Sequence, residues 1–268
     1  MNKGMKTIIR FIVKSKISFD LFKYLLTMGI LGAIFLYNSV QIGYNWQWYR
    51  VWRYLVPVTE FGLEPGILLQ GLAVTLQISV IGLLLSSLIG LISALLKLSN
   101  SVVGNIIAEI YIETIRNTPL LIQLLFWYFV IAPVFEMGAF TSAVIALSLF
   151  EGAYASEIIR GGISAIPTGQ WEAARSLGMS KGVAYRYVIL PQALRMMMPP
   201  LAGQGISLIK DSALVSVIAI YDLTMQGQAI IAETFLSFEI WFTVALLYLA
   251  MTLPLSQLVR FLEKKQER

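Results

Sequence analysis

The sequence predicts an all-α membrane protein with about six transmembrane helices, from its composition and from the spacing of its charges. Hydrophobic residues make up 57% of the 268 positions and charged residues only 13%, whereas soluble domains have roughly 45–50% apolar and 25% charged residues. A helix needs about 20 mostly apolar residues to cross the hydrocarbon core. Four uncharged stretches are long enough, and they are bounded by Lys23 and Arg50, Glu64 and Lys97, Arg116 and Glu136, and Glu239 and Arg260.

Two further spans are expected where polar residues interrupt the apolar pattern. The first covers residues 140–159 and contains Glu151 and Glu157. The second covers residues 193–220 and contains two consecutive prolines and the pair Lys210 and Asp211. Together with the four uncharged stretches they give six helices.

The distribution of Lys and Arg predicts the orientation, because short cytoplasmic loops are enriched in both. With the N-terminus inside, all of these cations fall in cytoplasmic segments except Arg50, Arg53, Arg116 and Lys210. Residues 1–23 lack the apolar core and the small-residue cleavage site of a signal peptide, so we expect this basic segment to be retained and to lie on the inner leaflet. Both termini are therefore predicted to be cytoplasmic.

The residue types that are missing exclude most enzyme chemistry. The chain has no Cys and no His, which excludes a disulfide, a thiolate or imidazole metal site, a Cys nucleophile and a His general base. The pI of about 9.3 does not indicate nucleic acid binding, since the cations flank the apolar spans instead of forming a stripe on a folded surface. We expect no catalytic, metal-binding or cofactor-binding residue in this chain.

Aromatic residues crowd the segment that follows the first span. Their rings suit the headgroup level of the bilayer, so we expect an interfacial belt on the outer side, and an aromatic ligand platform is the alternative. The six residues are Tyr44, Trp46, Trp48, Tyr49, Trp52 and Tyr54.

Small residues recur at every fourth position of the second span, at Gly82, Ser86, Gly90 and Ala94. At this spacing they form one flat stripe on a helix, which lets membrane helices approach closely. We expect the stripe to pack within the chain, and a subunit interface is the alternative.

The long polar insertion at residues 160–195 is expected to fold as two short helices. Pro167 and Gly169 break the helix that leaves the membrane, Gly178 permits a tight turn, and Pro191 is expected to end the second helix. The two helices would cover residues 170–177 and 182–189.

Several short motifs in and around this insertion occur together. Within it, the run Glu172-Ala173-Ala174 is followed by Gly178 and then by Leu190-Pro191. Outside it stand YIETIRNTPLLIQ at 111–123, AYASEIIRGGI at 153–163 and LIKDSALVS at 208–216. The first set resembles the EAA loop of membrane-spanning subunits of bacterial ABC importers, with Val188 where that family often has Ile. The second set resembles the polar amino acid branch of the family.

This resemblance implies a type I importer permease with a five-helix core over residues 66–262. An extra helix within residues 1–65 would precede the core, and a cytoplasmic tail, 263–268, would follow it. The loop residues would seat in a cytoplasmic ATP-binding cassette subunit, and this partner would bind ATP and Mg²⁺, since no G-x-x-x-x-G-K-[ST] phosphate loop occurs in this chain. The other implied partners are a second such ATPase, a second permease copy or a related permease, and a periplasmic amino acid binding protein at the bacterial inner membrane.

Charged and polar residues at membrane depth are the candidates for a substrate path, because an ionisable residue there normally faces a cavity or a partner. An α-amino acid carries an ammonium and a carboxylate, and fixed charges of both signs with neutral hydrogen-bonding groups would suit it. At i,i+3 spacing, Glu113 can pair with Arg116 and Glu157 with Arg160, and Lys210 and Asp211 can alternatively neutralise Glu151 for structural reasons. The candidates are Glu113, Arg116, Asn117, Thr118, Gln123, Glu151, Tyr154, Glu157, Lys210 and Asp211.

Three other functions remain open at this point. A permease of the same fold could carry another small solute, such as an opine or a peptide derivative. An ion-coupled secondary carrier is disfavoured because no inverted repeat is detectable and the polar loop would have no purpose. A non-transporting anchor would not need charges such as Glu151 at membrane depth.

Overall fold

The computed structural model describes residues 3–41, 43–59 and 62–266, and nearly all of them are helical. The chain divides into two compact units, Met1–Gln47 and Trp48–Arg268, which are described separately. The ends of the predicted basic tails, residues 1–2 and 267–268, lie outside the described residues, as do the side chains of residues 3–18.

The first unit consists of one long helix, α1 (Lys3–Gln41). Its part from Phe19 to Ser39 is long and apolar enough to cross a membrane. Two neutral polar side chains on this part bond to the helix itself: Thr27 donates to the Lys23 carbonyl (2.9 Å) and Asn38 to the Ile34 carbonyl (2.8 Å). Such internal pairing lets a helix enter hydrocarbon without unsatisfied polar groups.

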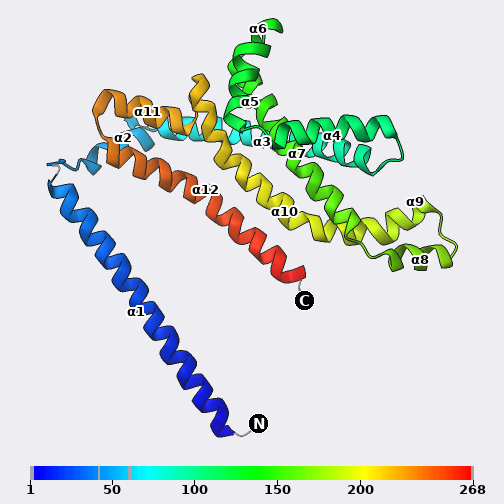
Figure 1. The fold of residues 1–268 in the computed structure, drawn as a ribbon. Coiled ribbons are helices and arrows are strands. Elements are labelled where there is room, and N and C mark those ends of the chain that lie inside the picture. The colour runs from blue at the N-terminus through cyan, green and yellow to red at the C-terminus, as the bar shows by residue number, and fades with distance from the viewer. Residues whose placement is uncertain (1–2, 42, 60–61, 267–268) are drawn as a thin grey trace. The chain divides into compact units, whose positions relative to one another are not determined.

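The second unit begins with short elements and continues with long helices (Figure 1). The short elements are a 3₁₀ turn, a four-residue helix and a two-stranded antiparallel hairpin in which Val58 pairs with Leu63. They are η1 (Trp48–Arg50), α2 (Trp52–Leu55), β1 (Val58–Thr59) and β2 (Gly62–Leu63). The elements up to the polar loop are α3 (Ile67–Leu98), α4 (Val102–Arg116), α5 (Leu120–Phe126), the π-helix η2 (Trp127–Ile131), α6 (Ala132–Val134) and α7 (Ala139–Ser164). Those from the loop onward are α8 (Thr168–Ser176), α9 (Lys181–Ala184), the π-helix η3 (Tyr185–Ile189), α10 (Leu190–Asp211), the 3₁₀ helix η4 (Ser212–Ile218), α11 (Leu223–Thr234) and α12 (Ser237–Gln266).

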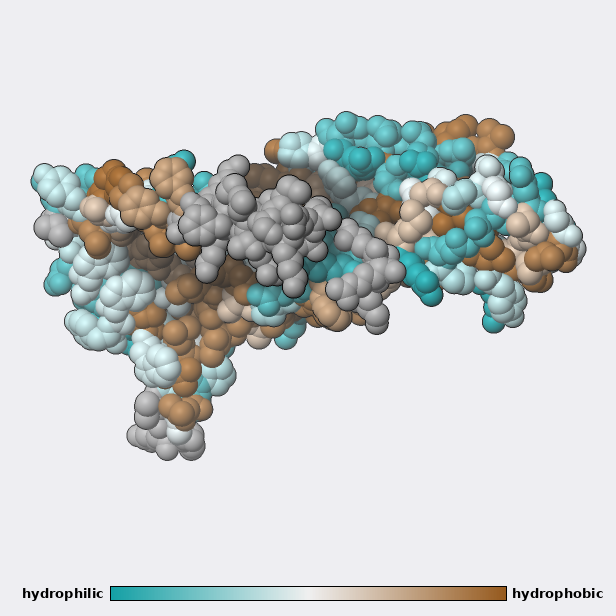
Figure 2. Space-filling model, turned by 90° about the horizontal axis from the view of Figure 1, so that it is seen from below, coloured by the Kyte–Doolittle hydropathy of each residue, from teal (hydrophilic) through white to brown (hydrophobic). Residues whose placement is uncertain are grey.

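The helices confirm the predicted class of membrane protein. Among the described residues, five helices are long and apolar enough to span a bilayer, and a bent pair makes up to six. Figure 2 shows a broad hydrophobic patch on one part of the face, beside a more hydrophilic part, and Leu, Ile and Phe side chains are exposed along most of the long helices. These surfaces are typical of helices that contact lipid.

The third span differs from the prediction. It is not one helix beginning after Arg116 but two segments, Val102–Arg116 and Leu120–Val134, that meet at 106°. Pro119 stands at the corner as the residue before α5, and proline both lacks an N–H and disfavours a helical residue before it. The corner turns α5 away from α4, which runs back alongside the end of α3 (Figure 1).

The small-residue stripe packs inside the chain, as predicted. Gly82, Ser86, Gly90 and Ala94 are all buried, and α3 packs most extensively against α7. A Cβ placed on Gly90 would lie 2.7 Å from the Ala155 Cβ and 3.0 Å from the Gly152 carbonyl oxygen. These two helices therefore touch backbone to backbone.

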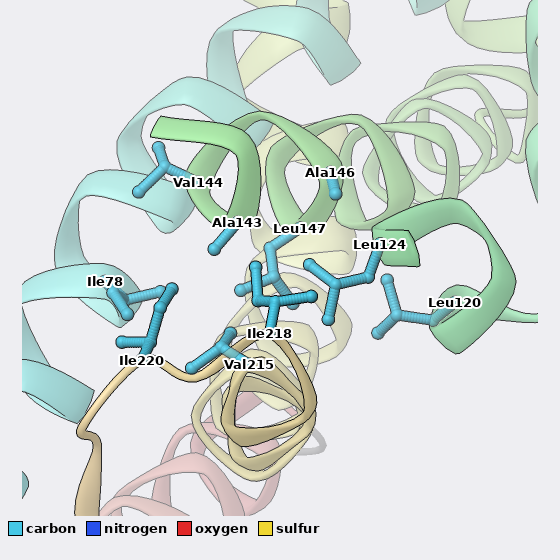
Figure 3. Packing of buried hydrophobic residues seen from close by; sticks show 10 residues of the cluster. All are labelled: Ile78, Leu120, Leu124, Ala143, Val144, Ala146, Leu147, Val215, Ile218 and Ile220. Atoms are coloured by element: carbon cyan, nitrogen blue, oxygen red, sulfur yellow. The ribbon is translucent and has the colours of Figure 1, made fainter. Parts of the chain in front are cut away.

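A hydrophobic core joins four elements near the middle of the second unit (Figure 3). Side chains from α3, α5, α7 and η4 converge there, and Ile78, Leu147 and Val215 are 0–1% exposed. Between membrane helices such packing is favoured by van der Waals contact, because lipid is as apolar as these side chains. This core fixes the base of α5 against α7.

Candidate functional site

The polar loop folds as a compact knob of two helical segments. α8 follows Pro167, and α9 begins after Ser180, whose side chain accepts a hydrogen bond from the Val183 N–H. Gly178 lies between them with a φ of +76°, a conformation that L side chains rarely adopt. Figure 1 places the knob at one end of the second unit, beyond α7 and α10.

One prediction about this loop was wrong. Pro191 does not end the second helix, because the chain continues as helix from Lys181 through η3 and α10. Pro191 lies in the first turn of α10, and the π-helical segment before it shifts the pairing so that the Leu190 N–H reaches the Tyr185 carbonyl. The wider turn accommodates the missing N–H of proline.

The knob presents a shallow hollow of about 480 Å³, lined by Thr168, Trp171, Glu172, Arg175 and Lys181. The lining carries one carboxylate and two cations beside an indole ring, so it can bind a partner surface through both polar and apolar contacts.

The six predicted coupling residues have different degrees of exposure. Glu172, Ala173, Gly178 and Pro191 are exposed, and Leu190 is half-buried. Ala174, in contrast, is 2% exposed, so of the two alanines only Ala173 offers its side chain to a partner.

A buried carboxylate stands in the middle of α7. Glu151 is 1% exposed, and the side-chain amide of Gln204 on α10 donates to its Oε2. Among the described residues, its Oε1 has no hydrogen-bond partner. Lys210, at the end of α10, is near enough to interact with it electrostatically, and the Asp211 carboxyl lies within hydrogen-bonding reach of the Glu151 carboxyl if one of the two is protonated. The structure thus brings together three of the predicted path residues and adds Gln204, which sequence reasoning missed.

A second group of charges joins α3, α4 and α7. Glu157 accepts two hydrogen bonds from Arg160, at 3.0 and 2.8 Å, which confirms that predicted pair. Lys97 lies 2.6 Å from Glu109 and 3.7 Å from Glu157. Arg116 lies 4.0 Å from Glu157, and its guanidinium stands over the Tyr154 ring at 5.3 Å.

The other predicted pair was wrong. Glu113 accepts a hydrogen bond from Asn117 (3.0 Å), whereas Arg116 turns toward Glu157 of α7. Both possibilities satisfy helical spacing, and only the fold of α4 against α7 decides between them. Lys97 and Glu109 were not among the predicted site residues. The short turn between α3 and α4, which sets two charged helix segments side by side, is the signal that could have identified them.

The neutral path candidates mainly cap the end of α4. Asn117 donates to the Glu113 carbonyl (2.8 Å), and Thr118 donates to the Thr114 carbonyl (2.9 Å). Gln123 donates to the Ile115 carbonyl (2.8 Å) and to the Thr118 hydroxyl (2.7 Å). The last carbonyls of a helix have no partner within it, so these side chains stabilise the corner between α4 and α5.

The comparisons with known proteins agree on one class. Residues 86–268 match the family described as "Binding-protein-dependent transport system inner membrane component". The chain is 43% identical over 204 residues to the glutamine transport system permease protein GlnP of Escherichia coli (strain K12), which covers 75% of this chain and 93% of that protein. It is 39% identical over 201 residues to the probable glutamine ABC transporter permease protein GlnP of Bacillus subtilis (strain 168), covering 74% and 92%.

Solved structures give the same fold. A chain in the crystal structure of an amino acid ABC transporter with histidines is 43% identical, with a TM-score of 0.70 over 74% of this chain and 94% of that one. A chain of the MetNI methionine ABC transporter has a TM-score of 0.60 over 73% and 96%. At 18% identity the latter supports the fold alone.

Proposed function

Because the chain belongs to the family of binding-protein-dependent transport system inner membrane components, we propose that it lines the path by which an ABC importer moves an amino acid inward. It is a permease subunit of a polar amino acid ABC importer. As such it is a multi-pass membrane protein and a transport subunit, not an enzyme. The knob formed by α8 and α9 is the observation that carries the coupling part of the proposal.

The knob would seat in a groove of an ATP-binding cassette subunit, and the residues that line its hollow would contact that subunit. The lining of Glu172, Arg175 and Lys181 beside Trp171 offers charge pairs and an apolar anchor, which interfaces commonly combine. This partner would hold ATP and Mg²⁺, and its closure would pull on α7 and α10, to which the knob is joined. Two such ATPases, a second permease copy or a related permease, and a periplasmic amino acid binding protein would complete the importer.

We propose that both termini face the cytoplasm of a bacterial cell. Six spans, with the bent pair counted as one, and the enrichment of Lys and Arg on one side support this orientation. The knob would then lie on the same side as the ATPases.

The amino acid would pass the buried carboxylate of α7. Glu151 has one oxygen without a partner among the described residues, and a polar group that is buried unpaired is costly unless a ligand satisfies it. A cargo ammonium can donate a hydrogen bond to this oxygen, while Lys210 and Asp211 would contribute to the net charge around it. Gln204 would orient the carboxylate.

Uptake by the assembled transporter in proteoliposomes tests this function. We expect uptake of labelled glutamine, glutamate, arginine or histidine to require ATP inside and binding protein outside, and Glu151→Gln to change the rates. Uptake driven by an ion gradient without ATP would contradict an importer of this class. Unchanged rates for all four amino acids would remove Glu151 from the path. Glu263→Gln, which changes an exposed carboxylate near the end of α12 that is not among the predicted path residues, is the matched control.

A further inference from the structure

The ionic group between α3, α4 and α7 contains more cations than carboxylates. Its cations are Lys97, Arg116 and Arg160, and its carboxylates are Glu109 and Glu157. From this imbalance we propose that Arg116 is a binding site for a carboxylate. This inference rests on the proposed function, and the ligand is the α-carboxylate of the amino acid cargo.

The distances identify Arg116 as the cation left over. Arg160 donates two hydrogen bonds to Glu157, at 3.0 and 2.8 Å. Lys97 forms an ion pair with Glu109 at 2.6 Å. The separation of 4.0 Å between Arg116 Nη1 and Glu157 Oε2 exceeds hydrogen-bond length, so this contact is only a weak electrostatic one.

The donors of Arg116 are unused. Among the residues that the structure describes, no acceptor forms a hydrogen bond with its guanidinium, whose contacts are Glu157 at 4.0 Å and the Tyr154 ring. Arg116 ends α4, where a cation commonly bonds to the free carbonyls. Here Asn117, Thr118 and Gln123 already cap them. Five N–H groups therefore remain available.

The guanidinium is also held in a suitable orientation. Its centre lies 5.3 Å from the centroid of the Tyr154 ring, and the side chain is 38% exposed. A guanidinium on an aromatic face keeps its edge free, and that planar edge matches the two oxygens of a carboxylate. The site is thus open, cationic and geometrically selective.

The site lies at a different level from the buried carboxylate. Tyr154 and Glu157 follow Glu151 by three and six residues on α7, which places them roughly 4.5 and 9 Å further along the helix. This direction leads toward the knob. A cargo that leaves Glu151 in that direction would meet Arg116 next.

The test is whether a variant of Arg116 still binds an amino acid with a free α-carboxylate more tightly than the α-amide that lacks it. The full-length permease in phosphatidylcholine nanodiscs is titrated with labelled glutamine, glutamate, arginine and histidine, and with their α-amides, which lack the carboxylate. We expect the wild type to bind the free acid about tenfold or more tightly than the amide, since a hydrogen bond to a charged group has about this worth. In Arg116→Gln the two forms should bind alike, and Arg116→Lys should keep part of the preference.

The chain offers a matched control in Arg53, which also stands over a tyrosine ring, that of Tyr54, at 4.9 Å. Arg53→Gln should keep the wild-type preference. A preference that persists in Arg116→Gln overturns the inference, and the proposed function survives if ATP-driven uptake is present. If phosphatidylglycerol in the nanodiscs abolishes the preference, the anion is a lipid phosphate and the assignment to cargo is overturned. Absence of binding for all four amino acids by the wild type overturns it as well, and absence of uptake is the separate failure of the proposed function.

Discussion

The helices α3 and α7 are held together in two ways along their length. The small-residue seam comprises Gly82, Ser86, Gly90 and Ala94 of α3 and the residues that face them, and at Gly90 the backbone of α3 touches that of α7. Beyond the seam, Lys97 at the end of α3 and Glu157 on α7 belong to a group of charges 2.6–4.0 Å apart. The stability of the seam depends on the volume of the residues packed in it, whereas that of the charged end depends on the distances between its charged groups. The seam can therefore fix the helices, whereas the charged end can exchange partners.

The largest effect should come from filling the seam. Gly90→Val would place a Cβ 2.7 Å from Ala155 and 3.0 Å from a backbone oxygen, and no rotation of a side chain can relieve a contact with backbone. We expect a loss of about 3 kcal/mol of folding stability, the upper end for overpacking. The measurement is the temperature at which the purified permease loses its monodisperse peak.

Gly161→Ala on α7 is the control for this substitution. A Cβ there has nothing within 4 Å, and alanine favours a helix more than glycine does. Its thermal midpoint should equal or exceed that of the wild type. Equal losses for Gly90→Val and Gly161→Ala would mean that the seam is not limited by volume.

Breaking the charged end should have a smaller effect on stability. Glu157→Gln leaves Lys97, Arg116 and Arg160 with one carboxylate, and it weakens the paired hydrogen bonds from Arg160. We expect a loss of about 2 kcal/mol, as for hydrogen bonds to charged groups. Glu113→Gln, which changes a carboxylate bonded to Asn117, should cost less. A thermal shift as large as that of Gly90→Val would contradict the distinction between the two regions.

The seam could be predicted from the sequence, because a four-residue period on one helix already specifies a face. Four spans were predicted from the gaps between charges and two from apolar stretches that charges interrupt, and the described residues contain five such helices, or six if the bent pair is one span. The charged end could be predicted only within one helix: the pair Glu157–Arg160 was correct, but Arg116 lies 4.0 Å from Glu157 of α7 instead of pairing with Glu113. Contacts of α4 with α3 and α7 depend on the turn after α3 and on the corner at Pro119, and no local pattern specifies the angle of either. The π-helix before Pro191 has no sequence signal that periodicity detects.

A third kind of constraint lies in the knob, where neither volume nor charge limits Gly178. Nothing lies within 4 Å of a Cβ there, but the φ of +76° is unfavourable for other residues. Gly178→Leu should cost about 1–2 kcal/mol locally and reshape the hollow, so that membrane insertion persists while ATP hydrolysis no longer responds to loaded binding protein. Gly182→Leu, at an open position without positive φ, should retain the response. Retention in Gly178→Leu would show that the turn is dispensable for coupling.

The smallest effect should come from the outermost ion pair of the charged end. Lys97 and Glu109 are 2.6 Å apart, but Glu109 is 49% exposed, and exposed pairs contribute less than about 1 kcal/mol because solvent and salt screen them. Glu109→Gln should therefore lower the thermal midpoint only slightly, and 1 M salt should remove most of the difference from the wild type. Lys97 would then be free to approach Glu157, from which it is 3.7 Å away, and this would release Arg116 further. We accordingly expect Glu109→Gln to leave the preference for a free carboxylate unchanged or stronger. A weaker preference would show that Glu109 acts on the carboxylate site in some way other than by holding Lys97.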